Sequence, residues 1–401
     1  MSRRLHRMTN VYIVDVLRTP VGKAPRGVFK NTLPDDLLAH VIKSLTSRHQ
    51  TVNWERLGDV IMGCAMPEGE QGMNVARIAS LLADLPQSVP AMTINRFCSS
   101  GVQSIASAAA SIRTGEMQMA LAGGVESMSM VPLGGNKYTA NPSIFDNEHV
   151  AIAYGMGITA ENVAKQWHIS REEQDKFAAE SHQKAVAAQE RGDFKAEIVP
   201  IEITQRMADL KTDTVKIQKK IISMDEGPRA DTSYDVIAKL RPVFAARGSV
   251  TAGNSSQTSD GAGVAFLASE EAVKEFNLKP MGRLLSYAVE GVPPEIMGIG
   301  PIKSIPVALK RAGLTLDQID WIELNEAFAA QSLAVIKELG LARDKVNPLG
   351  GAIALGHPLG ATGAVRTATL MHGLQRTGGK YGMVTMCIGT GMGATAVFEA
   401  F

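Results

Sequence analysis

The sequence predicts an α/β fold of more than one domain. Short apolar runs typical of buried strands alternate with helical patterns in the first third of the chain. The strand patterns are residues 11–16, 60–62 and 119–122, and the helical patterns are residues 36–44 and 75–83. The chain has 401 residues, more than the ~250–300 at which a single core usually stops growing. Two or more domains of α/β architecture are therefore expected.

The same alternation returns after residue 250. Strands are expected at residues 264–267 and 321–324, a helix at 326–339, and a final pair of strands at 384–387 and 394–399. The second half therefore resembles the first in layout, which indicates a duplicated architecture.

Residues 130–249 differ from both halves and predict an inserted loop or cap domain. This stretch is rich in charged, helix-forming residues and in polar connections. Ser170 and Glu173 have the spacing of a capping box, so a helix is expected to begin there and to run to about Arg191. We interpret that helix as structural.

Composition excludes several classes of protein. An apolar share of 45% and a charged share of 20% are ordinary for globular proteins, which argues against a disordered chain and against a membrane protein. The 41 Lys and Arg against 40 Asp and Glu leave a formal charge of +1, so no global field attracts nucleic acid or anionic membranes. We therefore expect neither partner.

The spacing of the cysteines and the composition of the first residues indicate where in the cell the protein is expected. The three cysteines show no CxxC spacing, which excludes a disulfide framework and a cysteine-based zinc site and favours a reducing cytoplasm. The basic start (Arg3, Arg4, Arg7) precedes an apolar run that is short and contains Asp15, unlike a secretory signal. Residues 381–398 lack charge, but glycines interrupt them, so two strands around a glycine loop are expected there instead of a membrane span.

The first candidate for chemistry is Cys98, in the run TINRFCSSG at residues 93–101. A strand, a tight turn and the start of a small-residue helix would place this thiol at a helix N-terminus. There the helix dipole favours the thiolate, and backbone N–H groups can meet a developing oxyanion. The structural alternative is a buried, inert cysteine.

The second candidate is His357, in NPLGGAIALGHPLGATG at residues 347–363. Five glycines surround this one histidine, so the backbone can approach a ligand closely while the imidazole is fixed as a base toward a thiol. Phosphate binding by the glycines is the competing function. The run has neither a Walker lysine nor a GxGxxG after a strand, which argues against that alternative.

Cys387 and Asn325 complete the set of candidates. Cys387 lies in MCIGTGMG at residues 386–393, where a strand leads into a glycine loop, and a second thiol fits chemistry that needs a separate proton donor at an α-carbon. Asn325 lies in ELNEAFAA at residues 323–330, either as a helix N-cap or as a group that orients water or an oxyanion near His357. Cys64 lacks such a loop and is interpreted as a packing residue.

These four segments, in this order, closely resemble the thiolase family. The resemblance covers essentially the whole chain, from RTP at residues 18–20 through GGVESM at residues 123–128 to the cysteine loop near the end. It implies a five-layered αβαβα fold made of two similar halves with an inserted loop domain, in a homodimer or homotetramer. The corresponding domains are residues 1–129 (completed by 250–280), 130–249 and 281–401.

The resemblance also implies catalytic roles. Cys98 is similar to the family's nucleophile, His357 to the group that activates it, and Cys387 to the second acid and base. His357 with a water held by Asn325 would form one oxyanion hole, and the N–H groups of Cys98 and Gly389 would form the other. Each donor of this kind typically contributes ~3–4 kcal/mol to lowering the barrier.

Binding residues are implied in the same way. The segment VTAGNSS at residues 250–256 matches the family's pantetheine-contacting stretch, and the implied contacts with coenzyme A are Arg229, Phe244, Ala252 and Ser256. The implied acyl pocket contains Met156, Met297 and Phe328, with the loop at residues 138–149 nearby. Acetoacetyl-CoA thiolases of the bacterial biosynthetic type carry His before that first methionine, whereas this chain has Gly155.

The smaller residue favours a degradative 3-ketoacyl-CoA thiolase (acetyl-CoA C-acyltransferase) of fatty-acid β-oxidation. It would bind acyl-CoA and CoA as substrates, hold no tightly bound cofactor and no metal, and could join a β-oxidation complex. An acetoacetyl-CoA thiolase that condenses two acetyl-CoA is the alternative within the family. Two further alternatives are a condensing synthase, which would lack the second cysteine, and a non-catalytic lipid-binding relative of the same fold.

Overall fold

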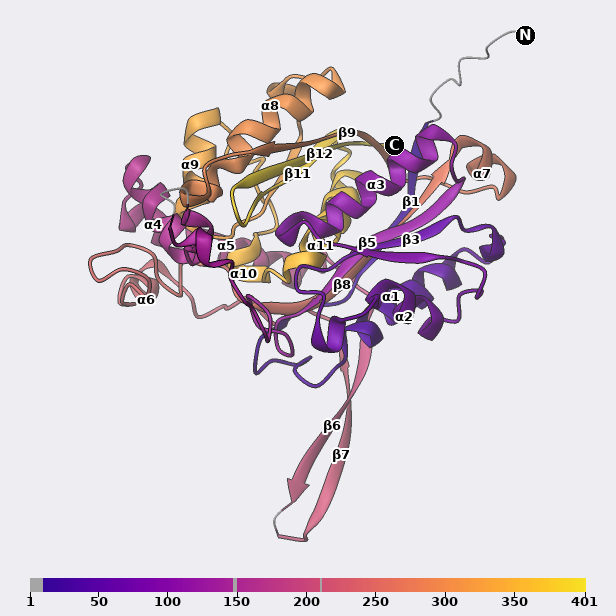
Figure 1. Ribbon diagram of the computed structural model, residues 1–401, viewed down its shortest axis with the longest axis horizontal. Helices are drawn as coiled ribbons and strands as arrows, with labels where there is room; N and C mark the ends of the chain where they lie inside the picture. Colours follow the sequence, from indigo (N-terminus) through magenta and orange to yellow (C-terminus); the bar gives the residue numbers. More distant parts are fainter. Residues whose placement is uncertain (1–9, 147–149, 210) are drawn as a thin grey trace.

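The computed structural model describes residues 10–146, 150–209 and 211–401 (Figure 1). The basic start with Arg3, Arg4 and Arg7 lies outside the described residues, as does His149 at the end of the predicted acyl loop. None of the helices in the described ranges has the length and apolar character needed to cross a membrane.

The N-terminal strands form one half of a ten-stranded sheet. In spatial order they are β1 (Val11–Arg18), β8 (Ser259–Ser269), β5 (Met119–Ser127), β3 (Asp59–Gly63) and β4 (Ala91–Ile94), with the short β2 (Gly22–Lys23) paired to β8. Strand β8 runs antiparallel to β1 and β5, whereas β3 is parallel to β5 and β4. Because β5 and β8 are buried along their whole length, this half is covered on both faces.

The C-terminal strands form the other half. Their order is β10 (Trp321–Leu324), β11 (Tyr381–Ile388), β12 (Met392–Ala400) and β9 (Gly282–Gly291). A short pairing of Tyr12 and Ile13 with Arg283 and Gly282 joins β1 to β9 and makes the two halves continuous. The uncharged stretch at 381–398 forms β11, a tight turn and β12, as its glycines predicted.

Helices occupy three layers around the two halves of the sheet (Figure 1). Helices α1 (Pro34–Arg48) and α2 (Val75–Leu82) cover the outer face of the N-terminal half. Helices α3 (Ser100–Thr114) and α11 (Leu359–Thr377) pack between the halves, and α8 (Gly300–Ala312) and α9 (Ala329–Leu339) cover the C-terminal half. The expected αβαβα order is therefore observed; the short helix α7 (Glu270–Glu275) follows β8, and the short helix α10 (Ala352–Leu355) is buried against α5.

The middle of the chain contains both a predicted and an unpredicted element. Helix α5 (Arg171–Arg191) begins at the predicted capping box, in which the Ser170 hydroxyl accepts from the N–H of Glu173 and the Glu173 carboxylate accepts from the N–H of Ser170. Helices α4 (Met156–Gln166) and α6 (Tyr234–Ile237) flank it in the chain. The division of the chain into residues 1–129, 130–249 and 281–401 stays a prediction.

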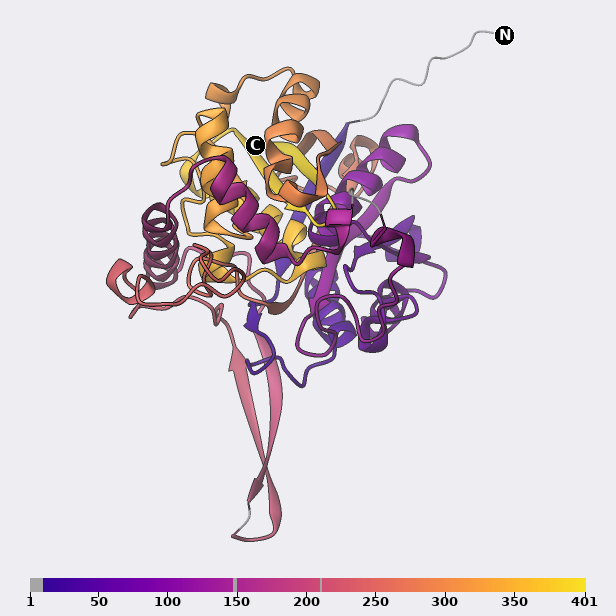
Figure 2. The ribbon, with the colours of Figure 1, turned by 60° about the vertical axis from the view of Figure 1, so that its left-hand side comes forward.

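A β-hairpin is the unpredicted element. Strands β6 (Ile201–Asp209) and β7 (Thr214–Ile222) pair with each other and project from the body of the molecule (Figures 1 and 2). Most of its side chains are exposed, so these strands carry little of the apolar alternation that marks a strand packed on a core. That is why the sequence indicated only polar connections here.

Glycines let α3 and α11 touch at the backbone. A Cβ on Gly363 would lie 2.3 Å from the backbone nitrogen of Val102, and one on Gly101 would lie 2.8 Å from that of Ala364. These separations are too short for any side chain. The close approach brings the start of α3, which follows Cys98, against the start of α11, which follows His357.

Replacing Gly363 by alanine should therefore destabilise the protein. Because the added methyl group meets backbone that cannot rotate away, we expect overpacking to cost ~1–3 kcal/mol and to lower the thermal midpoint. The matched control is Gly291→Ala at the end of β9, where the added Cβ has no atom within 4 Å. Equal midpoints for the two variants, measured by thermal unfolding, would contradict this account of the contact.

Candidate active site

Cys98 lies in a tight turn between β4 and α3. The turn is the 3₁₀ segment Phe97–Ser99, and Phe97 has a φ of +45°, a left-handed conformation that costs energy for a residue other than glycine. The Asn95 side chain accepts from the N–H of Phe97 at 2.8 Å, and the Ser100 hydroxyl accepts from the N–H of Arg96 at 2.8 Å. The strained turn is thus held by local side chains, with the thiol at the start of α3 as predicted.

The Cys98 thiol is partly buried and points toward backbone N–H groups. It packs against Ala65, Met128 and Leu359, the last being the first residue of α11. Burial raises the pKa of the thiol to about 11, while hydrogen bonds from the N–H groups of Gly389 and of Cys98 itself act in the opposite direction. These are the two N–H groups that the resemblance implies for an oxyanion hole, and that role stays a prediction.

His357 is buried, and both of its ring nitrogens have a polar neighbour. The preceding Gly356 has a φ of +92°, which a side chain would strain. Nδ1 of His357 lies 2.6 Å from Oγ1 of Thr362, and Nε2 lies 3.4 Å from Nδ2 of Asn325. Burial, with a smaller effect of the nearby Arg366, lowers the pKa of His357 to about 3. The imidazole is therefore neutral near pH 7 and able to accept a proton.

Asn325 is not a helix N-cap. Helix α9 begins at Ala329 and its N-cap is Phe328, so residues 326–328, expected to be helical, form a loop. The backbone N–H of Asn325 donates to the carbonyl of Thr385 on β11 at 2.9 Å. Its side-chain Oδ1 is buried and has no hydrogen-bond partner among the described residues. A free acceptor beside His357 fits the alternative interpretation, in which Asn325 orients a water.

Cys387 lies near the end of β11 and is fully buried. Burial raises the pKa of this thiol most, and the charge of a Cys98 thiolate raises it further. The turn of Cys98 packs against β11. Cys64 has a different setting: it lies in the core of the N-terminal half, with its sulfur 3.8 Å from the carboxylate of Glu126. The interpretation of Cys64 as a packing residue fits this position.

The residues predicted to line the acyl pocket gather around Cys387. Met297 and Phe328 form one buried apolar cluster with Cys387, and Met156 packs against that cluster. The ring of Phe244 meets the ring of Phe328 edge to face, with centroids 6.1 Å apart and an angle of 85°. An apolar wall therefore lies next to the second thiol.

The predicted coenzyme A residues divide into two groups. The N–H of Ser256 donates to the carbonyl of Ala327 at 2.9 Å, so the 250–256 segment lies along the loop that carries Asn325, with Ala252 exposed. Arg229 lies apart from this cluster. Its N–H donates to Nδ1 of His182 on α5, and its exposed side chain pairs with Asp231.

Two residues that support the site had no role assigned from the sequence. The buried Glu126 accepts hydrogen bonds from the N–H groups of Ala65, Met66 and Gly360. The feature of the sequence that could have indicated it is a carboxylate inside a buried strand. Thr362 contacts His357. The feature of the sequence that could have indicated it is its place in the same glycine-rich run, five residues after His357. Neither contact is visible without the position of α11.

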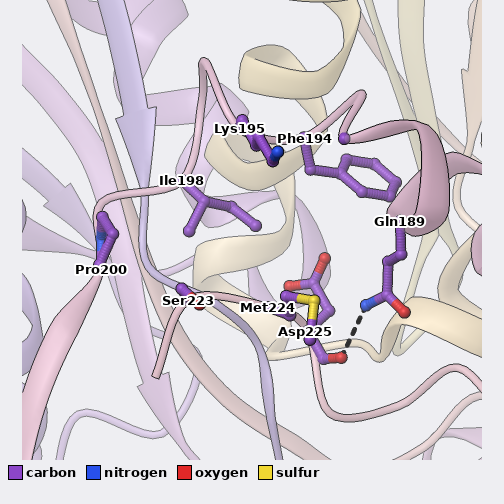
Figure 3. Close-up of a pocket in the computed structure, with 9 residues that line it drawn as sticks. Gln189, Phe194, Lys195, Ile198, Pro200, Ser223, Met224 and Asp225 are labelled. Atoms are coloured by element: carbon purple, nitrogen blue, oxygen red, sulfur yellow. Dashed lines mark hydrogen bonds between the residues drawn. The ribbon is translucent and has the colours of Figure 1, made fainter. Parts of the chain in front are cut away.

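A separate cavity of about 180 Å³ lies between the end of α5 and the base of the hairpin (Figure 3). Its lining includes Phe194, Lys195, Ile198, Met224 and Asp225, and the side chain of Gln189 donates to the carbonyl of Asp225 at 2.8 Å. No residue predicted to act in catalysis or binding lines this cavity.

Known proteins are similar to this chain over almost its full length. The thiolase N-terminal domain matches residues 11–271, and the thiolase C-terminal domain matches residues 278–400. A 3-ketoacyl-CoA thiolase of Bacillus subtilis is 50% identical over 98% of this chain and 100% of its own length. The peroxisomal 3-ketoacyl-CoA thiolase A of Mus musculus is 49% identical over 98% of this chain and 91% of its own.

Solved structures agree with the sequence comparisons. The acetyl-CoA acetyltransferase of Bacillus anthracis superposes with a TM-score of 0.89 at 40% identity and covers 99% of this chain and 100% of its own. The dimeric peroxisomal thiolase of Saccharomyces cerevisiae superposes with a TM-score of 0.88 at 40% identity and covers 98% of each chain. With both domains matched, the fold shared and relatives similar over the full length, this chain belongs to the thiolase family.

Proposed function

We propose that this chain cleaves 3-ketoacyl-CoA with CoA, giving acetyl-CoA and an acyl-CoA shortened by two carbons, as in fatty-acid β-oxidation. The observation that carries the proposal is that the turn of Cys98 packs against strand β11, which carries a second thiol, Cys387. Carbon–carbon cleavage needs a nucleophile and a separate proton donor, which two thiols can supply. Relatives named 3-ketoacyl-CoA thiolase, 50% and 49% identical to this chain, support the same substrate class.

The first half-reaction forms an acyl-enzyme. His357 takes the proton of Cys98, and the sulfur attacks the 3-keto carbon of the substrate. The tetrahedral intermediate collapses with cleavage of the bond between C2 and C3, and the electron pair of that bond becomes the enolate of acetyl-CoA. Cys387 protonates the enolate at C2, acetyl-CoA leaves, and the shortened acyl group remains on Cys98 as a thioester.

The second half-reaction transfers that acyl group to CoA. The Cys387 thiolate left by the first step accepts the proton of the incoming CoA thiol, and the CoA sulfur attacks the thioester carbonyl. The intermediate expels the Cys98 sulfur, which recovers its proton from His357. Every proton is returned, so the enzyme ends in its starting state with no redox cofactor consumed. The kinetics should be ping-pong.

Two sets of hydrogen-bond donors would stabilise the charges on oxygen. The N–H groups of Cys98 and Gly389 would bind the oxygen of the tetrahedral centre. His357, together with a water held by Asn325, would bind the enolate oxygen. Each such donor in a dry site typically contributes ~3–4 kcal/mol to lowering the barrier, because fixed dipoles need no reorganisation during the reaction.

CoA would bind along the surface next to this site. We propose Ala252 and Ser256 as pantetheine contacts, because their segment runs beside the loop of Asn325. Arg229 and Phe244, whose ring contacts Phe328, would be further contacts with CoA toward its nucleotide end. We further propose a homodimer or homotetramer in the cytoplasm, working alone or within a β-oxidation complex. The dimeric peroxisomal thiolase among the similar structures supports a dimer.

Acyl-chain length is where the two thiolase reactions differ. Met156, Met297 and Phe328 offer an apolar surface to an acyl chain. Gly155 is the exposed N-cap of α4 and has no atom within 4 Å of the position a Cβ would take, so a longer side chain could stand there without a clash. A glycine in place of histidine before Met156 would leave more room beside these residues, which favours a long 3-ketoacyl chain. The similar acetyl-CoA acetyltransferase structure keeps acetoacetyl-CoA chemistry as the second candidate.

Variants of the two thiols should separate their roles. Cys98→Ser should abolish thiolysis while leaving the fold intact. Cys387→Ala should still form an acyl-enzyme slowly from a saturated acyl-CoA, because that step needs no proton at C2, yet should fail at carbon–carbon cleavage. Steady-state thiolysis and acylation by radiolabelled acyl-CoA measure the two steps. Full turnover by either variant would refute the role assigned to that thiol.

Substrate preference tests the degradative assignment. We expect kcat/KM for a 3-keto thioester of eight to sixteen carbons to exceed that for acetoacetyl-CoA, because a glycine in place of histidine before Met156 would leave room for the longer chain. Gly155→His should reduce the ratio of the two values without unfolding the protein, since the histidine enters open space. Gly291→His, at another open position, serves as the control. A ratio below one in the unmodified enzyme would favour the acetoacetyl-CoA reaction instead.

A further inference from the structure

We propose that Thr362 is the positioning residue of His357: its hydroxyl holds the imidazole at Nδ1 and thereby directs Nε2 toward Asn325 and the reacting atoms. The contact is 2.6 Å long and buried, and neither residue is open to solvent. The inference rests on the proposed function in one respect, because it takes His357 as the base of the Cys98 thiol.

The conformation of Thr362 differs from that of the other threonines on the same helix. Thr367, Thr369 and Thr377 each donate a hydrogen bond to the carbonyl four residues earlier on α11, which is common for threonine in helices. Thr362 makes no such bond, and the Nδ1 of His357 is its hydroxyl's one partner in the described part of the chain. Its side chain is therefore turned out of the usual helical arrangement and toward the imidazole.

Helix α11 supports the loop of His357 at a second point. Arg366 lies one turn after Thr362, and its Nη2 approaches the carbonyl of Gly356 at 3.5 Å. Residues four apart on a helix share a face, so both side chains reach the two residues that end the glycine loop. Asn325 lies on the other side of the ring, at Nε2. The imidazole is thus held between α11 and the end of β10.

A hydroxyl suits this position because its oxygen can accept the hydrogen of Nδ1. When Nε2 is the base, Nδ1 carries a hydrogen in both the neutral and the protonated ring, so the contact persists as Nε2 gains and loses the thiol proton. A carboxylate in its place would stabilise the imidazolium and raise the pKa of His357. Burial and Arg366 lower the pKa of His357, and a neutral hydroxyl does not oppose them, which suits a base that must release its proton again in the second half-reaction.

Removing the hydroxyl should affect the chemical step and leave substrate binding intact. A ring held on one side only can rotate about its bond to Cβ, and a small misplacement of a base can cost on the order of 100-fold in rate. We therefore expect Thr362→Val, which has nearly the same shape, to lower kcat roughly 10- to 100-fold with little change in KM. Thr362→Ser, which keeps the hydroxyl, should restore most of kcat.

The control variant is Thr367→Val. Thr367 is equally buried on the same helix, and its hydroxyl donates to the carbonyl of Gly363 instead of to a site residue. It should therefore lose a buried hydrogen bond and some stability without the specific loss of kcat. A general effect of removing a hydroxyl from α11 would appear equally in both valine variants.

A second readout does not depend on turnover. The rate at which iodoacetamide alkylates Cys98 reports on deprotonation of the thiol, and peptide mass spectrometry identifies the labelled cysteine. Thr362→Val should slow this reaction by a factor comparable to its loss of kcat, whereas Thr362→Ser and Thr367→Val should react like the unmodified enzyme. If the valine variant does not fold, Thr362→Ala gives the same comparison with less bulk.

The outcomes separate the two proposals. Unchanged kcat and unchanged alkylation in the folded Thr362→Val variant would overturn the positioning role, as would an equal loss in Thr367→Val. If the unmodified enzyme shows no thiolysis, the proposed function fails, yet the alkylation rates still decide whether Thr362 acts through His357.

Discussion

The buried carboxylate of Glu126 is the interaction on which the site depends. It lies on β5 and accepts hydrogen bonds from Ala65 and Met66, which follow β3, and from Gly360 at the start of α11. A buried carboxylate without such partners would cost several kcal/mol, so its three N–H groups must stay in place together. One side chain therefore fixes the start of α11, which follows His357, against the layer that carries Cys98. The glycine contacts between α3 and α11 set the distance between these two helices.

His357 and Cys387 are buried in the resulting site, and its groups are neutral at rest. Burial raises the pKa of both thiols and lowers that of His357, so charge appears only when substrate binds and a proton moves. In such a buried site, fixed N–H dipoles stabilise a developing negative charge more strongly than in a solvated site, since less water screens them. Gly389 lies in the turn between β11 and β12, and its N–H acts to lower the pKa of the Cys98 thiol.

Local patterns in the sequence predicted much of this arrangement, whereas contacts between residues far apart in the chain could not be predicted from it. The strand of residues 321–324 and the capping box of Ser170 depend on neighbours in the chain, so periodicity and spacing revealed them. The contact of Glu126 with Gly360 spans 234 positions, and no local pattern encodes it. The expected helix at residue 326 begins three residues later, because the chain there forms the loop beside Asn325. The exposed hairpin lacks the apolar alternation that marks strands.

The central claim is that Cys98 accepts the acyl group from a 3-ketoacyl-CoA. The most direct measurement is to mix the enzyme with such a thioester in the absence of CoA, to stop the reaction with acid, and to locate the added mass by peptide mass spectrometry. The account predicts an acyl group, shorter than the substrate chain by two carbons, on the peptide that contains Cys98. An adduct on Cys387 or Cys64, or no adduct while acetyl-CoA is released, would contradict it.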